Sequence, residues 1–199
     1  MRKLVVTEFV SLDGVMEAPG GDDGYKHGAW TMPYWDDEIG EFKTAELEAA
    51  DAQLLGRVTY QGFSAAWPER SGDPFSDKFN AMPKYVVSST LDPDLSWNNS
   101  HLLEGDVGDA VRALKEGDGG DILLAGSATL AKDLLRRGLV DELRLAVFPL
   151  TLGEGKRLFD DVGRADLELV ESKTTATGVN LLVYRKATSA PAGADPNGE

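Results

Sequence analysis

The sequence DILLAGSATLAKDLLRRG, residues 121–138, places a strand, a tight turn and a helix in direct succession. Asp121–Ala125 supplies an apolar strand core, and Gly126-Ser127-Ala128-Thr129 turns directly into a helical stretch that closes at Gly138. Small residues at such a turn let a phosphate approach unpaired backbone N–H groups at the positive end of the helix dipole. The alternative is an ordinary turn whose serine or threonine only caps the helix.

The rest of the chain repeats this alternation and then becomes mainly β, which predicts an α/β fold of about eight strands and four helices. Further strands are expected at Lys3–Ser11, Ala52–Leu55, Tyr85–Ser89, Val140–Phe148, Leu167–Lys173 and Val179–Arg185. Helices are expected at Asp36–Asp51, from Thr59, and at Val107–Glu116 with Asp106 as N-cap, whereas Trp67–Pro83 is expected to be a loop. One domain, residues 1–186, precedes a tail at 187–199 whose composition cannot form a core.

Charge and composition exclude several functions. A formal net charge of −14 repels phosphodiester backbones and anionic lipid, so neither nucleic acid nor a membrane is expected as a partner. The chain has no cysteine, and His27 and His101 are not at ligand spacing, so no metal site is expected. We expect a cytoplasmic protein with a small-molecule substrate.

Two other predicted strand ends also carry groups that can bind phosphate. Gly56-Arg57-Val58-Thr59 follows an apolar strand and offers a guanidinium and a hydroxyl, although Arg57 could instead pair with one of the 34 acidic residues. Ser88-Ser89 ends the next strand, where hydroxyls also serve as turn formers. Open α/β sheets bind ligands at the carboxyl ends of their strands, so the three segments together favour an elongated, phosphate-bearing cofactor.

Hydride transfer to a ring C=N or C=O bond also needs a proton source, for which Asp13 and Glu38 are the main candidates. Asp13 lies between apolar segments, and partial burial there would raise its pKa toward a useful value. Its alternative role is a plain Asp-Gly turn. Glu38 shares a predicted helical face with Phe42, whereas Asp36 and Asp37 are expected to cap the helix or to be solvated.

At these residues the chain resembles the dihydrofolate reductase-like family, in the branch of the reductase domain of the riboflavin-biosynthesis bifunctional deaminase-reductase. The likeness covers about residues 3–186. The motifs that carry it are Ser11-Leu12-Asp13-Gly14, Leu55-Gly56-Arg57-Val58-Thr59-Tyr60, Val86-Val87-Ser88-Ser89, Gly126-Ser127, and Pro149-Leu150-Thr151-Leu152-Gly153-Glu154-Gly155 leading to Leu158-Phe159.

The resemblance implies a mixed, mainly parallel sheet flanked by helices, with NADPH bound along the strand ends. It implies that Arg57, Thr59, Ser88 and Ser89 surround the adenosine phosphates, and that the turn from Gly126 through Ser127 and Ala128 to Thr129 holds the pyrophosphate. Asp13 matches the acidic residue near the hydride-transfer site of the riboflavin branch. Glu38 takes the place of the carboxylate that contacts the pterin in dihydrofolate reductases.

Departures from the family pattern bear on the substrate. The Pro33–Glu38 spacing is longer than in folate enzymes, and because these 199 residues contain no cysteine, we expect no zinc deaminase half among them. The resulting hypothesis is an NADPH-dependent reductase of a pyrimidine- or pteridine-like heterocycle, acting as a homodimer. Two alternatives remain, a non-catalytic nucleotide-binding protein of the same fold and a hydrolase with paired carboxylates.

Overall fold

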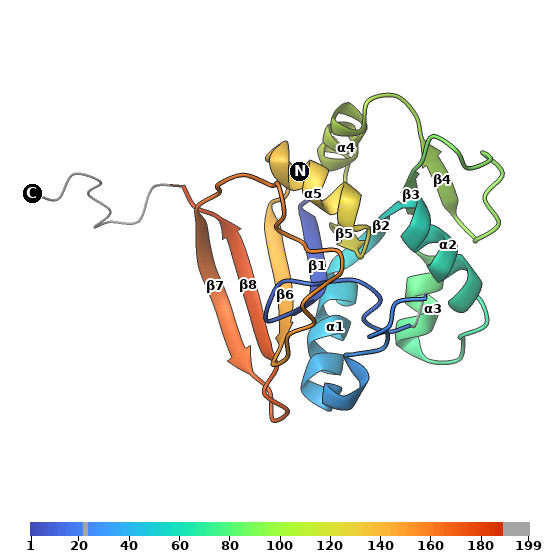
Figure 1. Cartoon of the computed structure of the whole chain (residues 1–199). Coiled ribbons are helices and arrows are strands. Elements are labelled where there is room, and N and C mark those ends of the chain that lie inside the picture. The colour runs from blue at the N-terminus through green and yellow to red at the C-terminus, as the bar shows by residue number, and fades with distance from the viewer. Residues whose placement is uncertain (22–23, 189–199) are drawn as a thin grey trace, which may run out of the picture.

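The computed structural model describes residues 1–21 and 24–188, which form one eight-stranded sheet flanked by helices (Figure 1). The strands lie in the order β4-β3-β2-β5-β1-β6-β8-β7. Their bounds are β1 (Leu4–Ser11), β2 (Ala50–Gly56), β3 (Lys84–Val87), β4 (Ser100–Leu103), β5 (Asp121–Ala125), β6 (Glu142–Phe148), β7 (Leu167–Thr174) and β8 (Asn180–Lys186). The helices are α1 (Asp37–Ala49), α2 (Arg57–Ala66), α3 (Pro74–Ala81), α4 (Val107–Glu116) and α5 (Ala128–Arg136), with a 3-10 turn, η1 (Met32–Tyr34).

The six strands from β4 to β6 in this order run parallel, and β8 and β7 complete the sheet in antiparallel fashion. This arrangement confirms the predicted mixed, mainly parallel α/β fold. Because parallel strands end at the same edge, β1, β2, β3, β5 and β6 deliver the segments that follow them to one side of the sheet. That carboxyl edge is where ligands bind in open α/β sheets.

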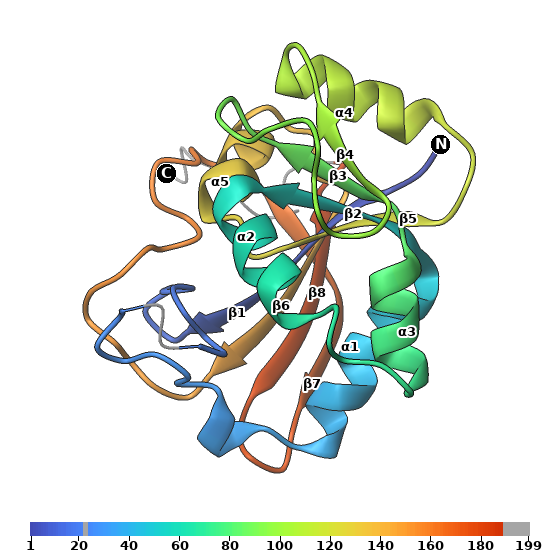
Figure 2. The same ribbon diagram turned by 90° about the vertical axis from the view of Figure 1, so that its right-hand side faces the viewer.

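The helices cover both faces of the sheet because successive strand residues point to opposite faces. Leu4 and Val6 of β1 pack in a cluster with α4 and α5, whereas Val5 between them packs with α1, α2 and α3. All three side chains are buried. Figure 2 shows α1 and α3 on one side of the sheet and α5 on the other. The apolar run Leu4–Val6 at the start of β1 follows from this burial on both faces.

Two predictions about the middle of the chain were wrong or incomplete. The segment Trp67–Pro83, expected to be a loop, contains α3. Asp73 caps this helix by accepting a hydrogen bond from the Ser76 N–H (3.0 Å), and Pro74 occupies its first turn, where a missing N–H costs nothing. Strand β4 was not anticipated at all; it pairs with β3 along four residues. The capping of α4 by Asp106 is confirmed.

Strand β7 forms one edge of the sheet, and all eight of its residues are exposed (Figure 1). Leu167, Leu169 and Val170 account for three of the nine large hydrophobic side chains exposed in the described residues. Edge strands present unpaired backbone groups to which another chain can add. The homodimer expected from the sequence stays a prediction, and β7 is the edge at which a second copy would pair.

Among the described residues, no helix is long and apolar enough to cross a bilayer. The same residues contain no group of three histidine, aspartate or glutamate side chains arranged to hold a metal ion. Most of the predicted tail, residues 189–199, lies outside the described residues.

Candidate active site at the carboxyl edge of the sheet

The three strand ends chosen from the sequence meet at the carboxyl edge. Strands β3, β2 and β5 are consecutive neighbours, and all three run parallel. Ser88 therefore follows β3, Gly56 ends β2, and Gly126 follows β5 along one continuous edge. Segments separated by up to 70 positions in the chain are brought together at adjacent strand ends.

Hydrogen bonds tie two of these segments into one unit. The Gly56 N–H donates to Ser127 Oγ (2.8 Å), and the Ser127 N–H donates in return to Thr59 Oγ1 (2.8 Å). The Ser127 side chain makes no capping hydrogen bond to α5, so the interpretation of this serine as a simple helix cap is wrong. It instead joins the turn after β5 to the start of α2.

The turn between β5 and α5 requires a glycine. Gly126 has φ +64° and Ser127 has φ +56°, so two successive residues adopt the left-handed conformation. A Cβ at Gly126 would lie 3.0 Å from Thr59 Oγ1 and 3.1 Å from Thr59 Cγ2, closer than side-chain atoms normally pack. The missing side chain therefore allows the Thr59 hydroxyl to reach the turn.

Free hydrogen-bond donors line this edge. The first backbone bond of α5 runs from the Ala131 N–H to Ser127 O, so the N–H groups of Ala128, Thr129 and Leu130 have no partner within the helix. Nearby, the exposed Arg57 guanidinium donates to Gln61 Oε1 (3.1 Å). No carboxylate within the described ranges lies at ion-pair distance from Arg57, so the alternative of a surface ion pair is not observed there.

At the end of β3, Ser88 serves as a turn former. Its Oγ accepts hydrogen bonds from the N–H groups of Thr90 (3.1 Å) and Leu91 (3.0 Å). Because a hydroxyl carries one donor besides its acceptor sites, the Ser88 hydrogen stays free to bind an anion. Ser89 is exposed beside it. Ser88 can therefore form the turn and still bind a phosphate, so the two roles considered for this serine pair are compatible.

Asp13 is held as an anion by the loop that follows β6. Its carboxylate accepts hydrogen bonds from Ser11 Oγ (2.6 Å) and from the N–H groups of Leu152 (3.0 Å) and Gly153 (2.8 Å), and Arg157 lies 3.4 Å away. These bonds, with that of Ser11 first, hold the pKa of Asp13 well below its usual range. The predicted rise in the pKa of Asp13 is therefore wrong. A role in orienting substrate stays a prediction.

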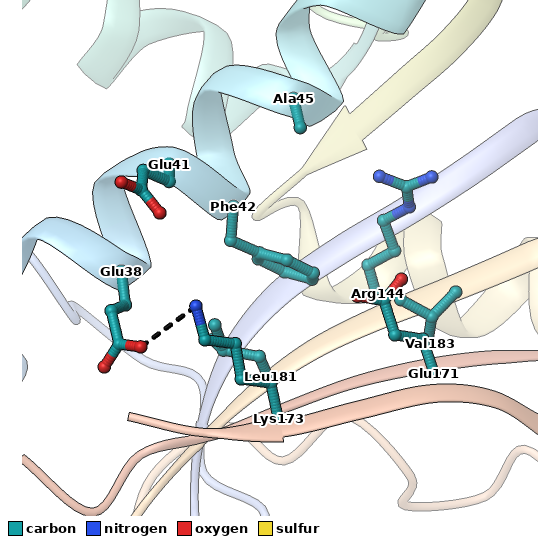
Figure 3. A pocket seen from close by; sticks show the side chains of 9 residues that line it. All are labelled: Glu38, Glu41, Phe42, Ala45, Arg144, Glu171, Lys173, Leu181 and Val183. Atoms are coloured by element: carbon teal, nitrogen blue, oxygen red, sulfur yellow. Dashed lines mark ion pairs between the residues drawn. The ribbon is translucent and has the colours of Figure 1, made fainter. Parts of the chain in front are cut away.

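Glu38 lines a pocket of about 210 Å³ between α1 and strands β6, β8 and β7 (Figure 3). Its carboxylate pairs with Lys173 Nζ (2.9 Å) and accepts a hydrogen bond from the Ala176 N–H (2.9 Å) in the turn after β7. These contacts, that of Lys173 first, lower the pKa of Glu38. Strands β1, β6 and β8 separate Lys173 and β7 from β5 and the proposed pyrophosphate turn, so Glu38 and the three strand ends do not form one cluster.

The sequence reasoning missed Glu8, an acidic residue in the centre of β1. Glu8 is only 5 % exposed, its Oε2 accepts a hydrogen bond from the Gly126 N–H (3.1 Å), and its Oε1 has no partner among the described residues. Burial raises the pKa of Glu8 well above its ordinary value, against the lowering effects of Lys43 and the Gly126 amide. The available signal was a lone carboxyl group within the otherwise uncharged strand LVVTEFVS.

Exposed apolar side chains gather on the segments that leave the carboxyl edge. Leu12, Met32 and Trp35 lie between β1 and α1, Val58 follows β2, and Phe159 follows β6; each is 44–68 % exposed. The Trp35 ring packs edge-on against Phe9 of β1, with 5.8 Å between centroids. An aromatic surface is therefore available beside the end of β1.

Comparisons with known proteins agree with this architecture. The family model of the RibD C-terminal domain matches residues 2–181. Uncharacterized protein YyaP of Bacillus subtilis (strain 168) is 33% identical over 192 residues, which cover 92% of this chain and 94% of that protein.

Two solved structures share the fold. A protein of Shewanella sp. PV-4, provisionally described as a riboflavin biosynthesis protein, superposes with a TM-score of 0.72 at 21% identity, covering 93% of this chain and 99% of that one. Dihydrofolate reductase from Enterococcus faecalis, solved as a complex with NADP(H) and RAB-propyl, gives a TM-score of 0.59 at 16% identity, covering 92% and 96%. The predicted dihydrofolate reductase-like fold is confirmed, and because the family model spans most of its length, the chain belongs to the RibD C-terminal domain family.

Proposed function

We propose that the protein is an NADPH-dependent reductase of a small pyrimidine- or pteridine-like heterocycle. The observation that carries this proposal is the alignment of free donors along the ends of β3, β2 and β5. Membership of a family of reductase domains supports the same class of reaction. The dihydrofolate reductase with the same fold was solved with NADP(H), which supports the choice of cofactor.

The residues present fit a phosphate-bearing dinucleotide. The left-handed turn at Gly126 and Ser127, with the free N–H groups of Ala128 and Thr129, suits a pyrophosphate at a helix N-terminus. The adenosine phosphates would bind to Arg57 and Thr59, which follow Gly56, and to the hydroxyls of Ser88 and Ser89. When bound, the nicotinamide would supply hydride to the substrate; the protein would hold both partners in register and exclude water.

The substrate would bind beside the end of β1. Trp35 offers a half-exposed ring that is already fixed against Phe9, and Leu12 and Val58 are further exposed apolar side chains on segments that leave the carboxyl edge. Flat heterocycles stack on such rings with little loss of side-chain freedom. The riboflavin biosynthesis assignment of the Shewanella protein supports a pyrimidine-like ring.

The test is a titration of the purified protein with NADPH and with NADH, followed by tryptophan fluorescence and thermal unfolding. We expect NADPH to stabilise the protein and Arg57→Ala to weaken its binding about fivefold to tenfold, because an exposed charge-assisted hydrogen bond to phosphate is worth about 1–1.5 kcal/mol. Arg164→Ala is the matched control, since this guanidinium is also exposed but precedes β7. A protein that responds to neither nucleotide would refute the proposal.

A non-catalytic nucleotide-binding protein is the second candidate. It is favoured by the state of Asp13 and Glu38, which are both held as anions and therefore cannot donate a proton at neutral pH. This candidate predicts NADPH binding without NADPH oxidation in the presence of any pyrimidine or pteridine. Loss of NADPH absorbance with one such compound would exclude it.

A further inference from the structure

The proposed reductase needs an acid that is still protonated at neutral pH, and neither acidic residue suggested by the sequence meets this need. We propose that Glu8 is the general acid of this site, a neutral carboxyl group that delivers the proton to the substrate heteroatom. This inference rests on the proposed reductase function and adds the residue that it lacks.

Glu8 lies where two strands diverge at the carboxyl edge. Thr7 pairs with Ala125 at the last position of the β1–β5 ladder, whereas β1 continues beside β6 as far as Ser11. Glu8 is thus the first residue of β1 beyond the end of β5. Its Oε2 contacts the Gly126 N–H (3.1 Å), so the carboxyl group lies directly beside the turn proposed for the pyrophosphate.

The surroundings of Glu8 favour its neutral form. The side chain shares a face of β1 with the buried Val6 and Val10, and no cation of the described part of the chain pairs with it. The charged side chains that act on the pKa of Glu8 are Lys43, which lowers it, and Glu46, which raises it; both belong to α1 and bind each other (2.6 Å). A buried carboxyl group without a paired cation is most stable when protonated.

Lys43 and Glu46 bind each other and the Thr7 hydroxyl. Glu46 accepts hydrogen bonds from Thr7 Oγ1 at both carboxylate oxygens (2.9 Å each), and Lys43 Nζ also donates to Thr7 Oγ1 (2.6 Å). Since Thr7 and Glu8 are consecutive in a strand, this network faces α1 and Glu8 faces the opposite side. The charge of Lys43 is therefore balanced by Glu46 and does not hold Glu8 as an anion.

The position along the edge also suits the role. From the Ser88 end of β3 to β1 is three strand spacings, about 14 Å. A dinucleotide whose adenosine phosphate lies at β3 and whose pyrophosphate lies at β5 would extend its reactive end toward β1. Glu8 is on β1 at that end, but on the face opposite to Phe9, so a heterocycle stacked on Trp35 would reach its carboxyl group past the end of β5, where β1 has lost its neighbour on that side. Glu38 instead pairs with Lys173 and Ala176 at the far side of β6 and β8.

The proposed step balances as follows. The substrate carbon of a C=N or C=O bond takes up hydride, and the reduced nicotinamide dinucleotide is oxidised by two electrons. The Oε–H bond of Glu8 breaks as a new N–H or O–H bond forms on the substrate heteroatom. Glu8 is left as a carboxylate and recovers its proton from solvent. Asp13 stays ionised throughout, so the two carboxyl groups have the opposite environments that divide such roles in acid-base sites.

The first test needs no substrate. Infrared difference spectra of the ligand-free wild-type protein and Glu8→Gln, recorded across pH, report the protonated carboxyl band of Glu8 alone. We expect a neutral carboxyl group at pH 7 that titrates well above the value of about 4.3 for an ordinary glutamate. A band that disappears near that ordinary value, with a Glu8→Gln variant that is folded by circular dichroism, would overturn the proposal.

The second test uses the reductase reaction. Glu8→Gln keeps an oxygen to accept from Gly126 but has no transferable proton, so kcat should fall about 100-fold to 10,000-fold while NADPH affinity stays within about twofold. Glu142→Gln is the matched control, because this glutamate side chain is only 12 % exposed and is paired with Lys3 and Arg144, but it begins β6 at the opposite edge of the sheet. It should keep the wild-type pH profile of kcat.

The outcomes separate this inference from the proposed function. Wild-type protein that fails to bind NADPH refutes the reductase function itself. Wild-type protein that binds and oxidises NADPH, together with a Glu8→Gln variant that keeps kcat within about twofold, leaves the function intact and overturns the role of Glu8. Loss of kcat in Glu8→Gln with partial recovery in Glu8→Asp supports it.

Discussion

Replacing Asp13 with asparagine should destabilise the fold, because this carboxylate joins the turn after β1 to the loop after β6. It accepts four hydrogen bonds, from Ser11 Oγ, from the N–H groups of Leu152 and Gly153, and from the Arg157 guanidinium. Asparagine can accept with one oxygen only, and its amide nitrogen would face a backbone N–H, so at least one amide of Leu152 or Gly153 loses its partner.

The magnitude follows from these bonds. Hydrogen bonds to a charged group contribute about 1.5–3 kcal/mol each, and the side chain of Asp13 is 24% exposed, so solvent competes for part of this. We expect Asp13→Asn to lower the free energy of unfolding by about 2–3 kcal/mol, and Tm by about 5–10 °C for a chain of this size. Asp160→Asn is the control, because this exposed aspartate in the same loop makes no hydrogen bond or ion pair with the described residues.

The pH dependence gives an independent check. The folded-state pKa of Asp13 lies below its unfolded value of about 3.9, so its contribution is fully present above that value and is lost as the pH falls below it. Urea denaturation should therefore show a gap between wild type and Asp13→Asn at neutral pH that narrows in acid. Equal stability at neutral pH, or a gap that does not change with pH, would refute this account.

Two further stability predictions concern the turn after β5 and a buried lysine. Gly126→Ala should lower the free energy of unfolding, measured by urea denaturation, by about 2–3 kcal/mol. About 1 kcal/mol of this is the strain of a left-handed alanine, and the rest is the close contact of the new Cβ with Thr59. In a Thr59→Ala background the loss should fall to about 1 kcal/mol. Burial lowers the pKa of Lys84 to about 8, below its unfolded value of about 10.4, so the unfolded state binds more protons between these values and stability should rise with pH there. From about pH 7.5 to about pH 9.5 the wild type should gain about 2 kcal/mol relative to Lys84→Met, measured by urea denaturation; equal pH slopes would contradict the lowered pKa.

The three strand-end segments proposed to bind the cofactor could be located from the sequence because each follows a recognisable strand. Hydrophobic runs ending at Gly56, Ser88 and Gly126 are local signals, and parallel strands place their carboxyl ends together whatever the loops between them contain. The order β3-β2-β5 then makes the three segments neighbours. Local pattern and general topology suffice for this part of the site.

The state of the acids could not be found in the same way. Ser11, which donates to Asp13, lies two positions before it, but the other hydrogen-bond partners lie on the loop after β6, with the backbone amides of Leu152 and Gly153 at 139 and 140 positions away. Nothing near Asp13 in the sequence indicates that these amides would help to hold it as an anion. Glu8 is neutral because of what surrounds it on the α5 side of the sheet, and the charged side chains that act on its pKa come from α1 on the other side. Burial and partners of a carboxyl group are properties of the assembled fold, so residue type alone does not show which acid is protonated.

A neutral Glu8 would also explain how an acidic chain could bind an anionic cofactor. About one residue in six is acidic, yet the segments 56–60, 88–90 and 126–129 contain none. Glu8, hydrogen-bonded to Gly126, is the one carboxyl group that contacts these segments within the described residues. As an anion about 6 Å from a bound phosphate charge it would cost about 3 kcal/mol at an effective dielectric constant of about 20, or roughly a hundredfold in affinity. Burial that keeps Glu8 protonated would therefore have two effects on the proposed reaction. It removes a negative charge from beside the turn, so that pyrophosphate can bind there, and it retains the proton that the substrate requires.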